Sequence, residues 1–171
     1  MTTFNYGKTI ALASAAAGLL VLSAVSAEAA DATAGAGATV TAPIAISQTA
    51  ALEFGSVASQ AGAAGTVVID TAGNRSSGDV DLLSGANPAA GAFAVTGTGN
   101  TAFGVVLPTT PVTLNSGADT ISVGSFVSSV GASSALSSGN GSFTVGASLN
   151  LGAAQATGTY SGSYTVTVAY E

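Results

Sequence analysis

The sequence predicts an all-β protein: a single antiparallel β-sandwich of the immunoglobulin-like kind, or a barrel, preceded by a signal peptide. Gly, Ala, Ser and Thr dominate the 171 residues and 47% of the chain is hydrophobic, a mixture typical of short strands joined by frequent turns. Apolar and polar side chains alternate with a period of two, and turn residues recur about every 8–12 residues. The length fits one domain plus a leader.

Residues 1–29 have the pattern of a secretory signal peptide. Lys8 precedes an apolar run over residues 10–25, and Ala27-Glu28-Ala29 follows as a small-residue cleavage site. The run is shorter than the roughly 20 apolar residues that span a bilayer. We therefore expect cleavage after Ala29 and export to the periplasm, cell surface or extracellular space of a bacterium, with no membrane association afterwards. A retained membrane anchor is the alternative.

The mature chain divides into a short arm and one domain. Residues 30–38 are rich in Ala and Gly and should form a flexible arm, and residues 39–171 should form the sandwich. Alternating or β-branched runs predict inner strands at residues 52–55, 66–70, 79–83, 93–96, 103–107, 112–114, 120–127 and 142–151. One face of the strand at 120–127 carries Ile121, Val123, Ser125 and Val127. Turn residues predict a turn over 71–78 and a loop over 131–141, in which Asn140-Gly141 is suited to close a hairpin.

The first and last strands of the domain have clear alternation. In the first, over residues 39–46, one face carries Val40, Ala42, Ile44 and Ile46. In the last, one face carries Tyr164, Val166, Val168 and Tyr170. Pro43 removes a backbone donor from the first strand, which should therefore lie at an edge or be supplied from outside the sheet. Tyr160, just before the last strand, is placed to tie a sandwich corner through its hydroxyl.

The amino-acid inventory excludes most catalytic chemistry. The chain has no His and no Cys, so Ser-His-Asp, Cys-His and His- or Cys-ligated zinc sites cannot form. Removal of the leader removes Lys8, the one lysine, and with it Ser-Lys dyads and Schiff bases. We therefore expect no enzymatic activity, no catalytic residue, no metal and no cofactor.

Carboxylates are the remaining source of site chemistry. Asp79 and Asp81, alone or with Asp70, could form a glycosidase-like pair or a calcium site. A hydrated strand edge beside a turn is the simpler interpretation, because a hard cation needs six or more oxygen ligands. Arg75, the one cation of the mature chain, is expected to pair with Asp70 or Asp79 and to fix that turn.

Surface charge is sparse in this sequence. The formal net charge is −6 with two basic residues in all, so the chain cannot neutralise the phosphates of a nucleic acid. The last strand has no charged residue before Glu171, although natural edge strands are usually guarded by charges or Pro. Such an edge invites strand addition. A monomer kept soluble by Ser, Thr and net negative charge would have a similar sequence.

Several short motifs follow one another in a specific order along the chain. They are Ala42-Pro43-Ile44, Leu52-Glu53-Phe54-Gly55, Thr66-Val67-Val68-Ile69, Gly73-Asn74-Arg75, Phe93-Ala94-Val95-Thr96-Gly97, Val145-Gly146-Ala147-Ser148-Leu149, Gly158-Thr159-Tyr160-Ser161-Gly162 and Val166-Thr167-Val168-Ala169-Tyr170. Their order resembles a bacterial secreted family, the domain-of-unknown-function family DUF4402. The resemblance covers residues 40–170, nearly the whole mature chain. It implies little about function, because the biochemical role of that family is not established.

Two residues near the C-terminal end have characteristic positions: Tyr170 is penultimate, and Gly158 is fourteenth from the end. This end is similar to that of chaperone–usher pilus subunits. The resemblance implies a pilin-like sandwich whose last strand is held by a periplasmic chaperone or partner, through Gly158, Tyr164, Val166, Val168 and Tyr170. It also implies a donor strand that completes a neighbouring subunit, here Val40, Ala42, Ile44 and Ile46. Many pilins contain a disulfide, which this chain cannot form, and the donor stripe lies close to the first core strand.

These observations predict a non-enzymatic exported structural protein, a fimbrial or surface-filament subunit that assembles by β-strand addition. Its expected partners are further copies of itself and a periplasmic chaperone and usher. The alternative is a self-complete secreted β-sandwich that binds a ligand such as a glycan, with residues 40–46 as the first strand of its own sheet.

Overall fold

The computed structural model describes residues 29–85 and 87–171, so the predicted signal peptide lies outside the described residues except for Ala29. The chain divides after Ala38, and every assigned strand lies in Thr39–Glu171. Residues 29–44 form no regular secondary structure and are exposed up to Pro43. None of the described segments forms a helix that is long and apolar enough to cross a membrane.

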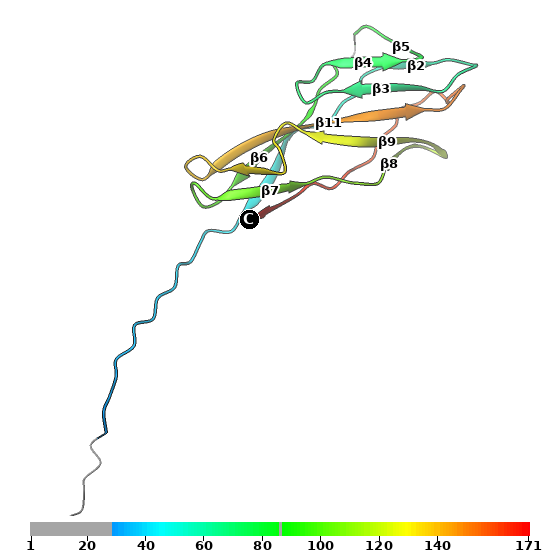
Figure 1. Ribbon diagram of the computed structural model, residues 1–171. Coiled ribbons are helices and arrows are strands. Elements are labelled where there is room, and N and C mark those ends of the chain that lie inside the picture. The colour runs from blue at the N-terminus through cyan, green and yellow to red at the C-terminus, as the bar shows by residue number, and fades with distance from the viewer. Residues whose placement is uncertain (1–28, 86) are drawn as a thin grey trace, which may run out of the picture. The chain divides into compact units, whose positions relative to one another are not determined.

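Twelve antiparallel strands make up the described domain. They are β1 (Ala45–Ala50), β2 (Val57–Ser59), β3 (Gly65–Ile69), β4 (Arg75–Gly78), β5 (Val80–Leu82), β6 (Gly91–Thr96), β7 (Ala102–Val106), β8 (Val112–Ser116), β9 (Asp119–Ser128), β10 (Ser133–Ala135), β11 (Asn140–Leu151) and β12 (Thr167–Tyr170). The predicted all-β fold is confirmed, and its layers form an antiparallel β-sandwich (Figure 1).

The strand β11 organises the larger sheet. This seven-stranded sheet has the order β1-β6-β11-β3-β4, with β9 also paired to β11 and β8 paired to β9. β11 pairs with β6 through residues 140–145, with β9 through 145–150 and with β3 through 147–151. A three-stranded sheet, β10-β7-β12, and the pair β2-β5 complete the structure. One long strand therefore contributes to both ends of the interior.

The interior has two hydrophobic clusters. The first, here the Phe93 cluster, contains Phe93, Val95, Phe103, Leu136, Phe143 and Val145. The second, here the Phe54 cluster, contains Phe54, Val67, Ile69, Val80, Ile121, Val123, Ala147, Leu149 and Leu151. The half-buried side chain of Phe126 packs against both clusters.

Most predicted inner strands are present with shifts of one or two residues. The predicted strands at 66–70, 79–83, 93–96, 103–107, 112–114, 120–127 and 142–151 correspond to β3, β5, β6, β7, β8, β9 and β11. Period-two burial is clear in β3, β6 and β11, where alternate side chains enter the core. These strands share β-branched or aromatic side chains on a buried face, which is the strongest sequence signal for a strand.

Several boundaries differ from the prediction. The strand expected over 39–46 begins only at Ala45, and residues 52–55 contribute a single bridge between Glu53 and Ala89. The turn expected over 71–78 includes β4, whose Arg-Ser-Ser-Gly sequence resembles a turn but pairs with β3 through its backbone. The predicted Asn140-Gly141 turn is also wrong. The turn lies at Ser138-Gly139, where both residues have positive φ, between the paired residues Ser137 and Asn140.

The face predicted for residues 120–127 is correct only up to Val123. Ser125 has a φ of 50° and lies in a β-bulge, where two residues of β9 oppose one residue of β11. The extra residue reverses the alternation, so Phe126 turns toward the interior and Val127 is 50% exposed. The bulge therefore allows Phe126 to contact both clusters.

Candidate functional site

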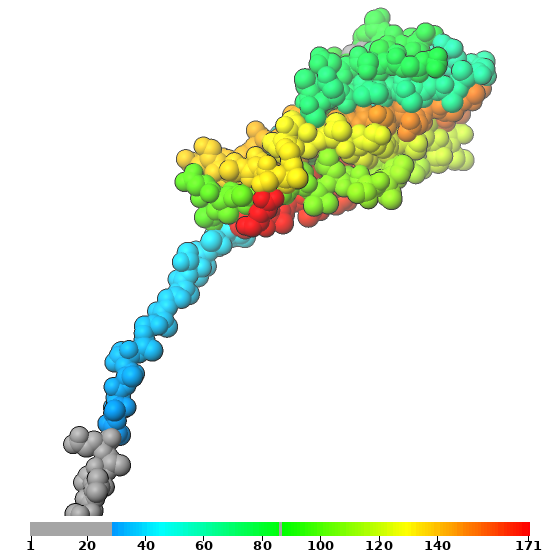
Figure 2. Space-filling model, in the orientation of Figure 1, coloured from blue at the N-terminus to red at the C-terminus, as the bar shows by residue number. Residues whose placement is uncertain are grey.

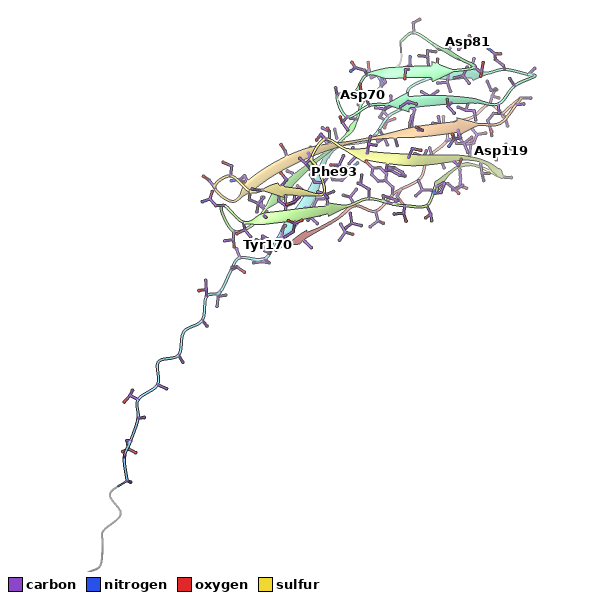
Figure 3. The ribbon with its side chains drawn as sticks, in the orientation of Figure 1. Asp70, Asp81, Phe93, Asp119 and Tyr170 are labelled. Atoms are coloured by element: carbon purple, nitrogen blue, oxygen red, sulfur yellow. The ribbon has the colours of Figure 1, made fainter. Side chains whose placement is uncertain are left out.

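The candidate carboxylates do not form a common site. Asp70 follows β3, Asp79 occupies the β4–β5 turn with a φ of 56°, and Asp81 lies in β5. Figure 3 shows Asp70, Asp81 and Asp119 in separate places. No group of three or more carboxylates among residues 29–85 and 87–171 could hold a metal ion.

Asp70 organises the turn between β3 and β4. Its Oδ1 accepts hydrogen bonds from the backbone N–H of Ala72 at 2.9 Å and of Asn74 at 2.8 Å. Its Oδ2 accepts from Asn74 Nδ2 at 2.8 Å. These bonds, with the Asn74 side chain the largest contributor, lower the pKa of the Asp70 carboxyl below 3.8 because they stabilise its ionised form. The carboxylate thus has a local structural role.

Arg75 does not pair with Asp70 or Asp79 as predicted. Its Nη1 donates to the carbonyl oxygens of Phe54 and Ser56, both at 3.1 Å, and its Nη2 donates to that of Leu83 at 3.0 Å. The guanidinium fork suits several carbonyl oxygens at once, and Asp70 is already occupied by its own turn. Arg75 therefore adds side-chain hydrogen bonds between β4 and the segment before β2, which has one bridge of its own.

The four candidate donor residues fall into different environments. Val40 is 95% exposed, and Ala42 is also exposed. Ile44 and Ile46 are half-buried and pack against the Phe93 cluster of their own chain. Ile46 lies in β1, opposite Val95 of β6. Of these four residues, the first two thus lie outside the sheet, whereas the last two pack in their own domain.

A hydrogen-bond network at Tyr170 marks this separation. The Tyr170 hydroxyl accepts from the backbone N–H of Thr98 at 2.7 Å and donates to the carbonyl of Ala42 at 2.8 Å. The Ala42 N–H in turn donates to Thr98 Oγ1 at 2.9 Å. A Cβ atom on Gly97 would overlap the Tyr170 hydroxyl, so this close approach requires glycine. The network joins the last strand to the residues just before β1.

The predicted face of the C-terminal strand is confirmed, although its ladder is short. β12 pairs with β7 from Thr167 opposite Val106 to Tyr170 opposite Phe103, and it is the outer strand of its sheet. Figure 2 shows the red C-terminal residues at the surface beside the green strand β7. The four alternate side chains of the predicted face all pack against the Phe93 cluster: Tyr164, Val166, Val168 and Tyr170. Gly158, the remaining candidate, lies outside β12.

Tyr164 completes an aromatic group in the Phe93 cluster. The ring centroids of Phe93 and Phe143 are 5.3 Å apart, and that of Tyr164 is 5.0 Å from Phe126 and 6.3 Å from Phe93. The Tyr164 hydroxyl has no hydrogen-bond partner within the described residues, and burial raises the pKa of its phenol. A Cβ atom on Gly91 would overlap this hydroxyl. Packing rather than hydrogen bonding holds this side chain.

A groove of about 870 Å³ lies over the Phe54 cluster. One wall is the segment 52–59 and the other is the segment 155–160, which includes Gly158. The floor is apolar and consists of Leu114, Ile121, Leu149 and Leu151. Glu53 is the one charged side chain in the lining. Polar side chains also line the groove, among them Ser56, Asn87, Gln155 and Thr157, so it offers polar as well as apolar contacts.

Side-chain hydrogen bonds hold the walls of the groove where strand ladders do not. Arg75 binds the first wall at Phe54 and Ser56. In the second wall, the Tyr160 hydroxyl donates to the carbonyl of Ala156 at 2.8 Å and accepts from Gln155 Nε2 at 2.9 Å. This contact confirms the predicted role of Tyr160 in a corner. The walls meet where Ser59 Oγ donates to the carbonyl of Gln155 at 3.2 Å.

The sequence pattern did not reveal this groove. Its walls are about a hundred residues apart in the chain, and neither has an alternation that would predict a missing neighbour. The Gln155 side chain also donates to the carbonyl of Thr120 at 3.2 Å. No feature of the sequence distinguishes this residue from the other polar residues of its loop. Arg75 is the one basic residue among residues 29–171, but the partners predicted for it were wrong.

The model of a family described as Domain of unknown function (DUF4402) matches residues 44–170, which is most of the chain. This chain belongs to the DUF4402 family. The match includes β1, both walls of the groove and β12. No curated protein and no solved structure gives a significant match, so the similarity to pilus subunits stays a prediction.

Proposed function

We propose that this DUF4402 protein is a non-enzymatic, exported structural subunit that forms surface filaments by β-strand addition. The observation that carries the proposal is the groove between segments 52–59 and 155–160, which has apolar residues at its floor. Its floor belongs to the Phe54 cluster. In the first wall, the residues before β2 form a single bridge, and the second wall contains no strand. An added strand would hydrogen-bond to the parts of these walls that lack a strand partner.

The charge distribution supports the same assembly. The edge strand β12 carries no charged side chain, and Val40 is an apolar side chain that is almost fully exposed. Unguarded edges and exposed apolar side chains favour association between chains. We further propose that residues 1–29 direct export, and that a periplasmic chaperone and usher cover the edge of β12 until assembly.

A self-complete secreted binding module is the second candidate. It is favoured by the pairing of β1 with β6 of the same chain and by the Tyr170 network, which together seat residues 42–50 in their own domain. In this case the groove would take a ligand such as a glycan instead of a strand.

The state of the exported protein separates the two candidates. Filament subunits should begin at Ala30 by intact mass, appear in the surface fraction as ladders that resist SDS, and form fibres visible by electron microscopy. A protein that stays monomeric by sedimentation at every concentration would overturn the filament proposal and favour the binding module. An intact mass that still includes residues 1–29 would overturn the proposed export signal.

A further inference from the structure

A small hollow of about 230 Å³ lies where β3 begins and where β4 and β11 end. Its polar side chains are those of Thr66, Asp79 and Asn150. The rest of its lining consists of Ala64, Gly65, Gly78 and Leu151. The hollow is distinct from the larger groove, because the two linings share Leu151 alone. Its volume is below the roughly 300–1,000 Å³ of pockets for drug-sized ligands and suits a ligand the size of one monosaccharide.

The sheet brings Thr66 and Asn150 together on its outer face. Their neighbours in sequence, Val67, Leu149 and Leu151, belong to the Phe54 cluster, and successive side chains of a strand point to opposite faces. Thr66 and Asn150 are directly opposite each other in the ladder between β3 and β11. Cross-strand partners have Cβ atoms about 5 Å apart, so a hydroxyl and an amide adjoin at the mouth of the hollow.

The carboxylate of Asp79 is free to bind a ligand, unlike that of Asp70. Asp70 accepts three hydrogen bonds within its own turn. Within residues 29–85 and 87–171, the side chains of Asp79 and Thr66 form no hydrogen bond, and Asn150 forms one of 3.5 Å, to Ser122 Oγ. Asp79 also has a φ of 56°, where glycine is the least costly residue. Neither the backbone nor a local contact therefore accounts for a carboxylate at this position.

A row of uncharged hydrogen-bonding side chains leads from the hollow across the sheet. Thr66 of β3 is opposite Asn150 of β11, which is opposite Ser122 of β9, which is opposite Thr113 of β8. These four strands lie side by side in Figure 1. Neighbouring strands are about 4.8 Å apart, so the row from Thr66 to Thr113 spans roughly 14 Å. The strand spacing is close to the length of one sugar unit in an extended glycan.

The polar groups of the hollow favour a neutral ligand that is rich in hydroxyl groups. The Asp79 carboxylate only accepts hydrogen bonds, whereas the Thr66 hydroxyl and the Asn150 amide both donate and accept. Neighbouring hydroxyls of a sugar match this set. An anionic ligand would be repelled by Asp79 and by the formal net charge of −6. A hard cation needs six or more oxygen ligands and would leave the amide N–H groups unused.

We propose that this hollow binds one sugar unit of a neutral glycan. Asp79 accepts hydrogen bonds from two adjacent sugar hydroxyls, and Thr66 and Asn150 bind the ring oxygen and a further hydroxyl. The next sugar units lie along the row toward Thr113. The site differs from the groove considered above for a ligand or an added strand, and it does not depend on filament assembly.

Titration with defined sugars locates the site. The chain from Ala30 onward, which retains every assigned strand, is titrated with neutral tetrasaccharides built from glucose, mannose, galactose or N-acetylglucosamine, and amide chemical shifts are followed by NMR. We expect at least one tetrasaccharide to shift the amides of Thr66, Asp79 and Asn150 and to leave those of residues 155–160 in place. No shift with any of these sugars would overturn the proposal, and so would shifts confined to residues 155–160. Calcium chloride or choline chloride that shifts the same amides when no sugar does would also overturn it.

Two carboxylates provide a matched pair of variants. Asp79→Asn and Asp81→Asn remove the same charge two residues apart, and Asp81 lies outside the lining of the hollow. Asparagine tolerates positive φ, so Asp79→Asn should fold with an unchanged melting temperature. We expect Asp79→Asn to raise the Kd of the bound tetrasaccharide about tenfold and Asp81→Asn to change it by less than about twofold. Equal effects would show that general charge acts in place of the hollow, and would overturn the site.

Thr113→Val tests whether the row extends the site. This residue lies three strands from Thr66, so we expect its variant to weaken the tetrasaccharide about threefold and to leave the matching methyl monosaccharide unaffected. Thr66→Val, in the hollow, should weaken both ligands. A Thr113→Val variant that binds both ligands like the wild type would overturn the row, and a Thr66→Val variant that does so would overturn the hollow.

Discussion

The two core clusters share one sheet but differ in what covers them. Strand β11 passes through both, and it buries Phe143 and Val145 in the Phe93 cluster and Leu149 and Leu151 in the Phe54 cluster. Over the Phe93 cluster, the three-stranded sheet and an aromatic group close the interior. Over the Phe54 cluster, the short pair β2-β5 and the segment 155–160, which contains no strand, leave a groove of about 870 Å³. The sheet that contains β11 is thus continuous under both clusters. The sandwich is open at the Phe54 cluster because the strands that cover that cluster are shorter.

The largest expected effect compares one leucine in each cluster. Leu136 is 1% exposed in the Phe93 cluster, and Leu151 is 6% exposed and lines the groove. Leu136→Ala should leave an enclosed cavity and cost about 3–4 kcal/mol, whereas Leu151→Ala should cost about 2 kcal/mol because it only deepens an existing groove. Urea unfolding of both monomeric variants measures the difference. Equal costs would mean that the two clusters are closed to a similar degree.

Arg75 tests what holds the open end together. Arg75→Met removes three hydrogen bonds to the carbonyls of Phe54, Ser56 and Leu83 and should cost about 2 kcal/mol. Amide hydrogen exchange should accelerate in residues 52–59, and exchange in β6 and β7 should change only by global unfolding. Arg75→Lys is the matched control, because it keeps the charge but not the fork, and should recover part of the loss. Uniform acceleration throughout the domain would argue against a local role.

The Tyr170 network provides a smaller test at the closed end. Gly97→Ala should cost about 1–2 kcal/mol, since the new Cβ atom overlaps the Tyr170 hydroxyl. Tyr170→Phe alone should cost about 1 kcal/mol through lost hydrogen bonds. The double variant should lose less than the sum, because removal of the hydroxyl makes room for the methyl group. Gly62→Ala, which meets no atom within 4 Å, is the control. Strict additivity would show that the overlap is relieved in another way.

The smallest effect concerns the turn at Asp70, between β3 and β4. Its folded pKa is lowered below 3.8, so the ionised carboxylate stabilises the fold above that pH, and this contribution is lost as the pH falls through the folded pKa. Asp70→Asn should reduce the pH dependence of the urea midpoint between about pH 5 and about pH 2. Ser76→Asn, on the exposed side of the same hairpin, should leave it unchanged. A variant with the wild-type pH profile would mean that Asp70 does not contribute to this dependence.

How much of the fold is predictable depends on where side chains meet the core. β3, β6 and β11 were predictable because Val67, Phe93 and Val145 belong to alternating runs whose apolar face is buried. β4 was not predictable, since its Arg-Ser-Ser-Gly sequence pairs only through the backbone. The bulge at Ser125 was not predictable either. The residues around it have a composition typical of a regular strand, but the extra residue reverses which side chains of β9 face the core.

The candidate site was less predictable than the fold for a related reason. The stripe at residues 40–46 could be recognised, but its division at Ala42 depends on the hydroxyl of Tyr170, which is remote in sequence. The position of Gly158 was noted, but its place in a groove wall depends on segments that meet only in the folded chain. The local alternation of side chains predicts strands, whereas a groove can be predicted only when the positions of segments remote in sequence are known.

The ladder between β1 and β6 also has a mechanical consequence. Five register pairs, from Ala45 with Thr96 to Ala50 with Ala92, follow directly after the arm. Tension applied through the arm along the axis of β1 would load these pairs together in shear, so that they would have to rupture almost simultaneously instead of opening one at a time. A chain pulled in this direction would therefore resist extension at its entry point before its cores are stressed.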